Sequence, residues 1–505
     1  MKKKIYFFVA MLLMGASGAV AQVAINKTTF PDSLFRTYVA KHIDTDTDKV
    51  LSAEEIANVT ELQLMNEENI GNCKSLKGVE YLTGLKALDF SNSAVDSIDL
   101  SKNTLLESLT CTQTALKALD LSKNTKMYSL DCSESEITNL NITGCPEIQN
   151  ITIDGNHIDS LDVTHCPNLG YIYADDNNLK TLPLTGNPIL YYLSVTSNPL
   201  DSINVASCPE LNTLYCDGTN ITKIDVTKNT NLDLLNCTND ALGSIDVSKN
   251  TVLTQLNLDN CGLTSLALPA DTLLSGLSIS SNPLGTLDLS MLKNLRTLSC
   301  NAIGLRSLDV TPFTNLTTLE CANDSLTKLD VSKNTELTRL VCFNNQMVAL
   351  DLTACTKIND FDGGTNKRAV KVNDAGQFDL ATLASFGFDP AKASNWVDGT
   401  VDGTILTFDD VNTNATYKYD CGNGESAIFT LVPKVITSAP LIGGKAVTAY
   451  AYGNVINIVG TNANAQVIDA AGRTIYAGTA RQITVGSNGL YIVKVAGKTF
   501  KVMAR

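Results

Sequence analysis

Residues 106–121 read LESLTCTQTALKALDL, and the spacing of the apolar side chains in this stretch decides the fold. With Leu109 as an anchor, apolar residues fall at offsets −3, 0, +2, +7, +10 and +12, which here are Leu106, Leu109, Cys111, Leu116, Leu119 and Leu121. Alternate residues of an extended chain face the same side, so each pair two positions apart predicts a short extended segment with one buried face. One copy of the pattern therefore predicts two extended segments joined by a turn.

The anchor recurs at a fixed interval through more than half of the 505-residue chain. An apolar residue stands at every twenty-first position, without insertion or deletion, at Leu88, Leu109, Leu130, Ile151, Ile172, Leu193, Leu214, Leu235, Leu256, Leu277, Leu298, Leu319, Leu340 and Phe361. A globular domain tolerates changes of loop length, whereas each coil of a stacked solenoid must lie in register on the coil before it. We therefore predict a mainly β solenoid over residues 59–367, with the anchors in a parallel sheet. A coil of 21 residues leaves no room for a multi-turn helix on its back, where we expect extended or 3₁₀ structure.

The first 21 residues have the composition of a secretory signal peptide. Three lysines precede an apolar run from Ile5 to Met14, and Ala19, Val20 and Ala21 provide a cleavage site of small residues. This run is too short to span a bilayer, and no later segment holds 18 consecutive apolar residues, so we expect an exported chain without a transmembrane segment. The formal net charge of −14 argues against nucleic acid or an anionic membrane as a partner.

Fourteen cysteines in an exported chain would ordinarily suggest disulfides. Two columns of the repeat hold most of them: seven follow an anchor by two residues (Cys111, Cys132, Cys216, Cys237, Cys300, Cys321 and Cys342) and four by fifteen (Cys145, Cys166, Cys208 and Cys355). In-register side chains on neighbouring coils leave the backbone with parallel Cβ vectors, about 4.8 Å apart, which does not fit disulfide geometry. The columns therefore predict buried free thiols that fill the core.

Residues 22–58 precede the repeats and predict a small helical cap, which an open solenoid needs. Short helices are expected around residues 30–39 and 53–56, with the loop 44–55 between them. This loop has the spacing of an EF-hand calcium loop, with candidate ligands at Asp44, Asp46, Asp48, Val50, Ser52 and Glu55. Lys49 stands at the sixth position, where glycine normally makes the sharp turn. Two interpretations stay open, a calcium site or a helical cap without metal.

The 21-residue rhythm stops beyond residue 363, and two further β domains are expected. Residues 368–436 contain alternating runs at 369–372, 404–408, 416–419 and 427–432, which predict a small immunoglobulin-like sandwich that covers the open end of the solenoid. Residues 437–440 form a short linker. The remainder of the domain assigned to residues 437–505 has seven strand-like runs separated by glycine-rich turns.

Two parts of the chain resemble known families. Residues 82–360, with their cysteine column and LDVSKNT segment at 329–335, resemble internalin J-type leucine-rich repeats. Residues 441–505 resemble the C-terminal sorting domain of the type IX secretion system, with matching residues at Asp469, Gly472, Arg473, Gly489, Tyr491 and Lys494. The second resemblance implies a Bacteroidetes surface protein. It also implies that the type IX machinery carries the chain across the outer membrane, and that the sorting domain is cleaved as the body is attached to surface lipopolysaccharide.

The outward positions of the predicted front strand are offsets −1, +1 and +3 from each anchor. Tyr171, Tyr173, Tyr192 and Tyr215 occupy such positions on three consecutive coils, and Tyr171 and Tyr192 share a column. Tyrosine offers a large amphipathic contact area at low entropic cost, so the cluster predicts a binding patch. The alternative is packing between surface residues that supports the sheet. Tyr191 lies beside them, with its facing undecided.

The same columns hold nine acidic residues and one basic residue, Arg339. Asp154, Asp175 and Asp217 lie on the coils of the tyrosines, and Asp154 and Asp175 are column neighbours whose charges repel unless a cation or a basic partner intervenes. A basic protein surface or a calcium-bridged ligand is one interpretation; ordinary solvated acidity is the other.

No motif of an enzyme is present, since the chain has three histidines and neither a nucleophile motif nor a phosphate loop. The sequence therefore predicts a non-enzymatic protein. Together with the tyrosine cluster, the two resemblances imply a secreted adhesin, attached to the outer membrane surface, that binds a host or bacterial surface protein in host-cell attachment or biofilm formation. A module that captures glycans or nutrients is the alternative.

Overall fold

The computed structural model describes residues 22–269, 273–285, 288–435, 441–442, 445–452 and 454–504. The predicted signal peptide and the 437–440 linker lie outside the described residues. The chain divides into two compact units, Met1–Asn345 with Asp351–Gly363 and Gln346–Leu350 with Gly364–Arg505. Within the described ranges, no helix has the length and apolar character needed to cross a membrane.

The first unit begins with the helical cap that the sequence predicts. Helix α1 (Ser33–His42) starts at Asp32, whose carboxylate accepts hydrogen bonds from two amides of the first turn. Helix α2 (Ala53–Asn58) starts at Ser52, which forms a capping box with Glu55. Strands β1 (Val23–Ala24) and β2 (Val50–Leu51) pair antiparallel and join residues 23–24 to the segment between the helices.

The solenoid follows, and its front is a parallel sheet of fifteen short strands, as the period predicts. The strands are β3 (Glu61–Gln63), β4 (Ala87–Asp89), β5 (Ser108–Thr110), β7 (Ser129–Asp131), β9 (Asn150–Thr152), β10 (Tyr171–Tyr173), β11 (Tyr192–Ser194), β12 (Thr213–Tyr215), β13 (Leu234–Asn236), β15 (Gln255–Asn257), β17 (Gly276–Ser278), β18 (Thr297–Ser299), β19 (Thr318–Glu320), β20 (Arg339–Val341) and β21 (Asp360–Asp362). Each anchor is the central residue of its strand and pairs with the anchors before and after it. From Leu88 to Leu340, no anchor is more than 2% exposed.

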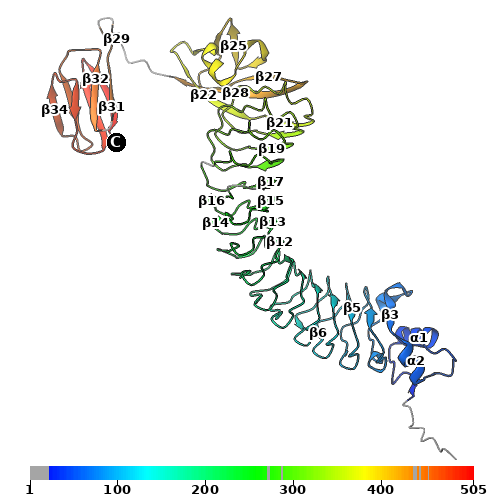
Figure 1. Ribbon diagram of the computed structural model, residues 1–505. Helices are drawn as coiled ribbons and strands as arrows, with labels where there is room; N and C mark the ends of the chain where they lie inside the picture. Colours follow the sequence, from blue (N-terminus) through cyan, green and yellow to red (C-terminus); the bar gives the residue numbers. More distant parts are fainter. Residues whose placement is uncertain are drawn as a thin grey trace, which may run out of the picture. The chain divides into compact units, whose positions relative to one another are not determined.

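The back of the solenoid is mostly irregular, with two short parallel pairs among its described residues. These are β6 (Ala118–Asp120) with β8 (Asn139–Asn141), and β14 (Ser244–Asp246) with β16 (Ser265–Ala267). Three 3₁₀ turns occur in the first coils, η1 (Leu64–Asn66), η2 (Ile70–Asn72) and η3 (Val79–Tyr81). In Figure 1 the front sheet lies on the inner side of the curve of the solenoid, and the back pairs lie on the outer side.

The core confirms the prediction for the cysteines, because all fourteen are free and buried. The structure adds a role for the cysteines that follow an anchor by fifteen positions. In this column Asn124 donates from its amide to the carbonyls of Leu100 and Asn103 on the preceding coil. Cys145 donates its thiol to the equivalent carbonyl of Leu121 at 3.4 Å. Cysteine therefore replaces asparagine in this column as a smaller donor to the same row of carbonyls.

The second unit contains two sets of sheets. The first has β22 (Asn366–Val372), β23 (Gln377–Asp379), β24 (Ala393–Val397), β25 (Gly399–Asp402), β26 (Ile405–Phe408), β27 (Ala415–Gly422) and β28 (Glu425–Val435), with 3₁₀ segments η4 (Leu380–Phe386) and η5 (Pro390–Lys392). They form a four-stranded sheet, β22-β28-β27-β24, and a three-stranded sheet, β23-β26-β25. The buried Tyr417 stacks on Trp396 at 4.5 Å between ring centroids, and its hydroxyl donates to the carbonyl of Val348.

The second set has β29 (Leu441–Ile442), β30 (Lys445–Ala446), β31 (Thr448–Tyr452), β32 (Val455–Val459), β33 (Ala465–Ile468), β34 (Thr474–Gly478), β35 (Gln482–Thr484), β36 (Gly489–Val495) and β37 (Lys498–Ala504). Its main sheets are β31-β32-β35 and β34-β33-β36-β37. They enclose an apolar core that includes Val467, Tyr491 and Val493. Two C-terminal β domains are thus present, as the sequence predicts.

Candidate functional site

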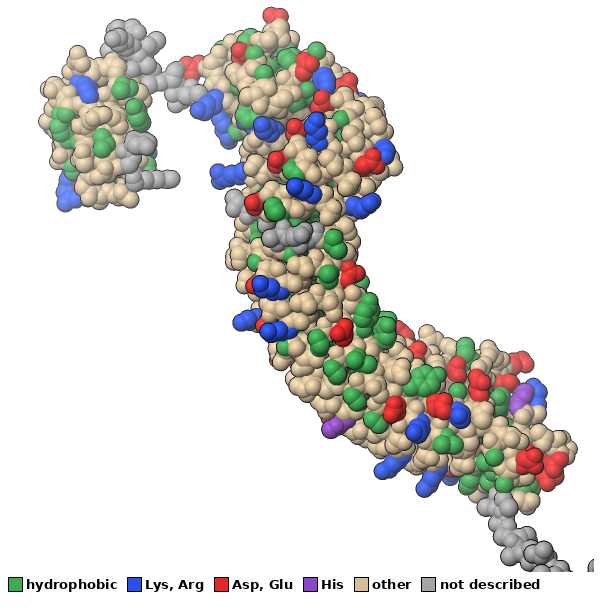
Figure 2. All heavy atoms as spheres, in the orientation of Figure 1, with side chains coloured by type: hydrophobic (Ala, Val, Ile, Leu, Met, Phe, Trp, Pro, Cys, Tyr) green, Lys and Arg blue, Asp and Glu red, His purple; other side chains and the backbone are tan. Residues whose placement is uncertain are grey.

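The predicted tyrosines lie on three neighbouring strands of the front sheet. β10 places Tyr171 and Tyr173 on either side of the buried Ile172, and β11 and β12 place Tyr192 and Tyr215 outward in the same way. The register pairs Tyr171 with Tyr192 across β10 and β11, which confirms that the two share a column. Figure 2 colours tyrosine together with the hydrophobic side chains. Side chains of this colour gather on the inner side of the bend near β12.

The rings pack along a diagonal of the sheet rather than straight across it. The rings of Tyr173 and Tyr192 stack with 4.5 Å between centroids and 29° between planes. Tyr192 also contacts Tyr215 at 6.0 Å. Each of these three side chains is half-buried as a result. The stack is a preorganised aromatic surface, since its members hold one another in place before any partner arrives.

Tyr191 is a residue of this site whose facing the sequence leaves undecided. Its ring lies 6.0 Å from the ring of Tyr171, and the two side chains are 45% and 40% exposed. Ile189 on the same coil is 49% exposed. We call Tyr171, Tyr173, Tyr191, Tyr192 and Tyr215 the tyrosine patch. Its outer edge is open, while its centre is stacked.

The three aspartates predicted beside the tyrosines take part in hydrogen bonds between coils. Asp154 accepts the backbone N–H of Asp175 at 2.7 Å. Asp175 in turn accepts the backbone N–H of Thr196 at 2.8 Å and the hydroxyl of Ser194 at 2.6 Å. These donors offset part of the charge of both carboxylates, and a cation or a basic partner beside them stays a prediction.

Asp217 follows the same pattern with side-chain donors, accepting from the hydroxyl of Thr196 at 2.9 Å and the amide of Asn236 at 3.0 Å. Among the described residues, no lysine, arginine or histidine forms an ion pair with Asp154, Asp175 or Asp217. The acids beside the tyrosine patch are hydrogen-bonded but are not neutralised by a basic side chain.

Burial changes the acidity of several groups at this site. Burial raises the pKa of Asp154 to about 6, and it also raises the pKa of Asp175. Burial, followed by the neighbouring tyrosines and aspartates, raises the pKa of Tyr192 to about 12. The Tyr192 hydroxyl is therefore protonated at neutral pH, so it is available as a hydrogen-bond donor.

The cap loop gathers three of the six predicted calcium ligands. Carboxylate oxygens of Asp44, Asp46 and Asp48 all lie within 4.8 Å of one another. Asp44 is buried, and its Oδ1 has no hydrogen-bond partner among the described residues. Lys49 adopts the left-handed conformation that glycine usually supplies at this point of the loop, with φ of 67°. Its backbone N–H donates to Asp44.

The other three predicted ligands make contacts of their own within the cap. The carboxylate of Glu55 accepts from Thr45 through one oxygen and from Ser52 through the other, and the backbone N–H of Ser52 leads the groups that lower the pKa of Glu55 to about 2. Ser52 is the N-cap of α2, and Val50 pairs with Ala24 in the β1–β2 pair. Glu55 therefore acts as a cap in this structure.

The predicted sorting residues lie in the last β domain. Asp469 forms an ion pair with Arg473 at 2.8 Å and accepts the backbone N–H of the same residue, in the turn that also holds Gly472. Tyr491 is buried, and its hydroxyl donates to the carbonyl of Ser487. Gly489 begins β36 and Lys494 is an exposed residue of it. The structure thus shows a turn held by an ion pair, a core residue and two exposed basic side chains, Arg473 and Lys494.

No family model and no curated protein matches the chain. Solved structures do. The functional domain of InlJ from Listeria monocytogenes, described as including a cysteine ladder, is 24% identical with a TM-score of 0.54, covering 82% of this chain and 99% of that one. The internalin InlF of Listeria monocytogenes is 22% identical with a TM-score of 0.52, covering 68% and 99%. A leucine-rich-repeat protein of Leptospira interrogans is 19% identical with a TM-score of 0.55, covering 63% and 91%. The chain therefore has the internalin-type leucine-rich-repeat fold.

Proposed function

We propose that the protein is a non-enzymatic adhesin of the cell surface that binds another protein through the tyrosine patch. The observation that carries this proposal is the grouping of five tyrosines on three consecutive coils, with Tyr171 and Tyr191 exposed at the edge. Aromatic anchors surrounded by polar groups are typical of binding hot spots. The partner is a host or bacterial surface protein, and the adhesion supports host-cell attachment or biofilm formation.

The charge beside the patch favours a partner with basic residues. Asp154, Asp175 and Asp217 lie on the coils of the rings and form no ion pair among the described residues, so an arriving lysine or arginine gains one. Arginine also stacks well on the face of a tyrosine ring. We therefore expect binding to weaken as the ionic strength rises, without being abolished.

The test compares two exposed tyrosines inside the patch with one outside it. The double variant Tyr171→Ser and Tyr191→Ser should lose most binding of the purified chain to immobilised epithelial cells and to biofilm. Tyr128→Ser is the matched control, because Tyr128 is 44% exposed and stands two residues before its anchor, as Tyr191 does. Equal binding by the double variant and the control would refute the assignment of the patch.

A glycan-capture module is the second candidate, and one observation favours it. The stacked Tyr173 and Tyr192 rings beside acceptor carboxylates are the kind of surface on which a sugar ring packs. A glycan array distinguishes the two functions. Saturable binding to one class of glycan, lost in Tyr192→Ala, would replace the protein partner with a carbohydrate.

We further propose that the last domain acts as a type IX secretion sorting signal, with Asp469, Gly472, Arg473, Gly489, Tyr491 and Lys494 as its characteristic residues. On this proposal the body reaches the outer surface and is attached to lipopolysaccharide after the domain is cleaved. Removal of residues 490–505 deletes β37 and most of β36, and should trap the chain in the periplasm. Surface labelling of the truncated chain would contradict the proposal.

For the cap, we propose that Asp44, Asp46 and Asp48 bind calcium, with Val50, Ser52 and Glu55 completing the loop. The proposal is supported by the three clustered carboxylates and by the Oδ1 of Asp44, which is buried without a partner among the described residues. Calorimetric titration with calcium should show one site that Asp46→Asn weakens and that Asp96→Asn, an exposed change in the solenoid, leaves unchanged. Absence of binding in the unaltered chain leaves the interpretation of a cap without metal.

A further inference from the structure

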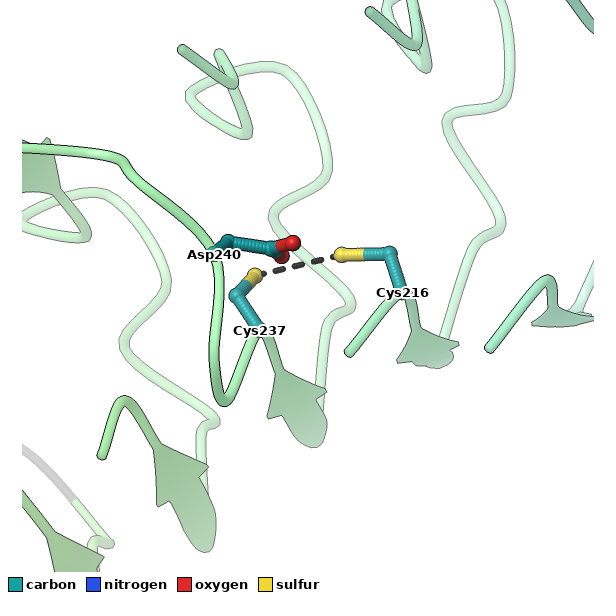
Figure 3. Close-up of side chains that lie close together, drawn as sticks. All are labelled: Cys216, Cys237 and Asp240. Atoms are coloured by element: carbon teal, nitrogen blue, oxygen red, sulfur yellow. Dashed lines mark hydrogen bonds between the residues drawn. The ribbon is translucent and has the colours of Figure 1, made fainter. Parts of the chain in front are cut away.

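Inside the solenoid, behind β12 and β13, three potential metal ligands from two adjacent coils lie together (Figure 3). Cys216 and Cys237 stand two residues after the anchors of their coils, and Asp240 stands five residues after the anchor of the second. The two Sγ atoms are 3.3 Å apart, and the two sulfurs and one carboxylate oxygen all lie within 4.8 Å of one another. The neighbouring coils place Val195 and Leu258 at the cysteine position, so the pair is isolated in its column.

Asp240 is the unusual member of this cluster, because it is a buried carboxylate with only half of its hydrogen bonds made. The side chain is 2% exposed. Its Oδ1 accepts the backbone N–H and the hydroxyl of Thr219, at 2.9 and 2.7 Å. Its Oδ2 has no hydrogen-bond partner among the described residues. A carboxylate oxygen buried in this way costs free energy unless a proton or a cation satisfies it.

The donor set of two sulfurs and one oxygen fits a borderline-soft divalent cation such as zinc. Tetrahedral zinc with Zn–S bonds of about 2.3 Å holds its sulfurs roughly 3.7 Å apart, so the observed pair needs only a small expansion. Cys261 on the next coil is a further buried thiol, which donates to the carbonyl of Cys237 at 2.9 Å.

The chain contains a matched arrangement that lacks this geometry. Cys300, Cys321 and Asp324 occupy the same offsets on two later coils. There, however, Oδ1 of Asp324 accepts the backbone N–H groups of residues 303, 304 and 305, and the three side chains do not form a ligand group among the described residues. The same residue types at the same spacing therefore differ in whether their donor atoms meet.

We propose that Cys216, Cys237 and Asp240 form a binding site for one thiophilic divalent cation of the zinc class, inside the solenoid. Without metal, the two thiols are in hydrogen-bonding contact with each other, and Oδ2 of Asp240 has no partner among the described residues. Binding of the cation releases the thiol protons, satisfies this oxygen and joins two coils at the middle of the solenoid. Since all three side chains are buried, the cation enters while the chain folds or when the coils open locally.

The test is refolding of the full chain, under reducing conditions, in the presence of Co²⁺ as the spectroscopic probe. One equivalent should bind, giving a thiolate-to-cobalt charge-transfer band and the intense visible bands of tetrahedral Co²⁺. Oxygen ligands in the cap loop cannot produce the charge-transfer band, so that loop does not interfere. Excess Zn²⁺ should displace the cobalt and bleach both features.

Matched variants assign the site. Cys237→Ser and Asp240→Asn should each weaken Co²⁺ binding at least about tenfold, whereas Cys321→Ser and Asp324→Asn should retain it. Circular dichroism verifies the fold of every variant, and Asp240→Asn, which is nearly isosteric, decides the outcome if Cys237→Ser fails to fold. The proposal is overturned if the unaltered chain shows no charge-transfer band, or if the band is equally strong in Asp240→Asn.

Discussion

The coils of β9–β12 and those of β19–β21 share one repeat but treat their outward acids differently. At the later coils Arg339 forms ion pairs with Glu320, at 3.0 Å, and with Asp360. At the earlier coils Asp154 and Asp175 accept backbone amides instead, and no described basic side chain pairs with them. The interiors are alike, because both anchors Leu193 and Leu340 are fully buried. The repeat thus fixes what lies inside, while the outward positions are free to differ in what they offer a partner.

Truncation of a buried anchor should cause the largest loss of stability, and the loss should be the same in both regions. Leu193→Ala and Leu340→Ala each remove a fully buried anchor and should lower the free energy of unfolding by about 2–5 kcal/mol. Chemical denaturation followed by circular dichroism measures the two losses. If only one substitution lowers the free energy of unfolding, the interiors of the two regions are not equivalent. Differences between their outer surfaces could then not be separated from differences in stability.

Substitution of an outward aromatic residue should weaken partner binding in one region and leave it unchanged in the other. Tyr192 lies at the centre of the stack between Tyr173 and Tyr215, so Tyr192→Ala should weaken binding to the target surface by about 2 kcal/mol or more. Phe343→Ala, an outward aromatic change near Arg339, should leave binding unchanged. Surface plasmon resonance on captured cell-surface extract measures both. Equal losses would mean that the whole sheet, rather than the tyrosine patch, contacts the partner.

The period and the side-chain alternation predict most of the solenoid because both depend on sequence spacing alone. They identify the anchors, the buried cysteines and the shared column of Tyr171 and Tyr192, which the register confirms. Spacing says nothing of rotamers, so it could not predict that the Tyr192 ring turns towards Tyr173 rather than Tyr171. Only the neighbouring side chains determine that choice.

Hydrogen-bond partners are the second part that spacing does not predict. The amide of Asp175 that Asp154 accepts is exposed by the turn after the strand, which a reading of outward columns omits. Glu55 has the position of a calcium ligand, yet its carboxylate instead satisfies donors from Thr45 and Ser52 at a helix start. In both cases nearby backbone N–H groups donate hydrogen bonds to a carboxylate, and only the folded chain brings these donors next to it.

A smaller effect concerns pH. Because burial raises the pKa of Asp154 to about 6 in the folded chain, the folded state holds this proton more tightly than the unfolded state does. Stability from this group is complete below its ordinary pKa of 3.8 and is lost as the pH rises to about 6 and beyond. Asp154→Asn keeps the acceptor oxygen and should reduce the fall in melting temperature between pH 4 and pH 7. Asp96→Asn, an exposed change on an earlier coil, is the control and should leave the fall unchanged.

The smallest effect should come from the ion pairs at the other region. Arg339 is exposed to solvent, and exposed pairs add little because water and salt screen them. Arg339→Gln should therefore lower the melting temperature only slightly at low ionic strength, and the difference from the unaltered chain should vanish in 1 M NaCl. A large loss that persists in salt would show that Arg339 supports the fold. Glu320 and Asp360 would then be structural residues. The difference between these ion-paired acids and the acids without an ion pair beside the tyrosine patch would concern stability rather than partner recognition.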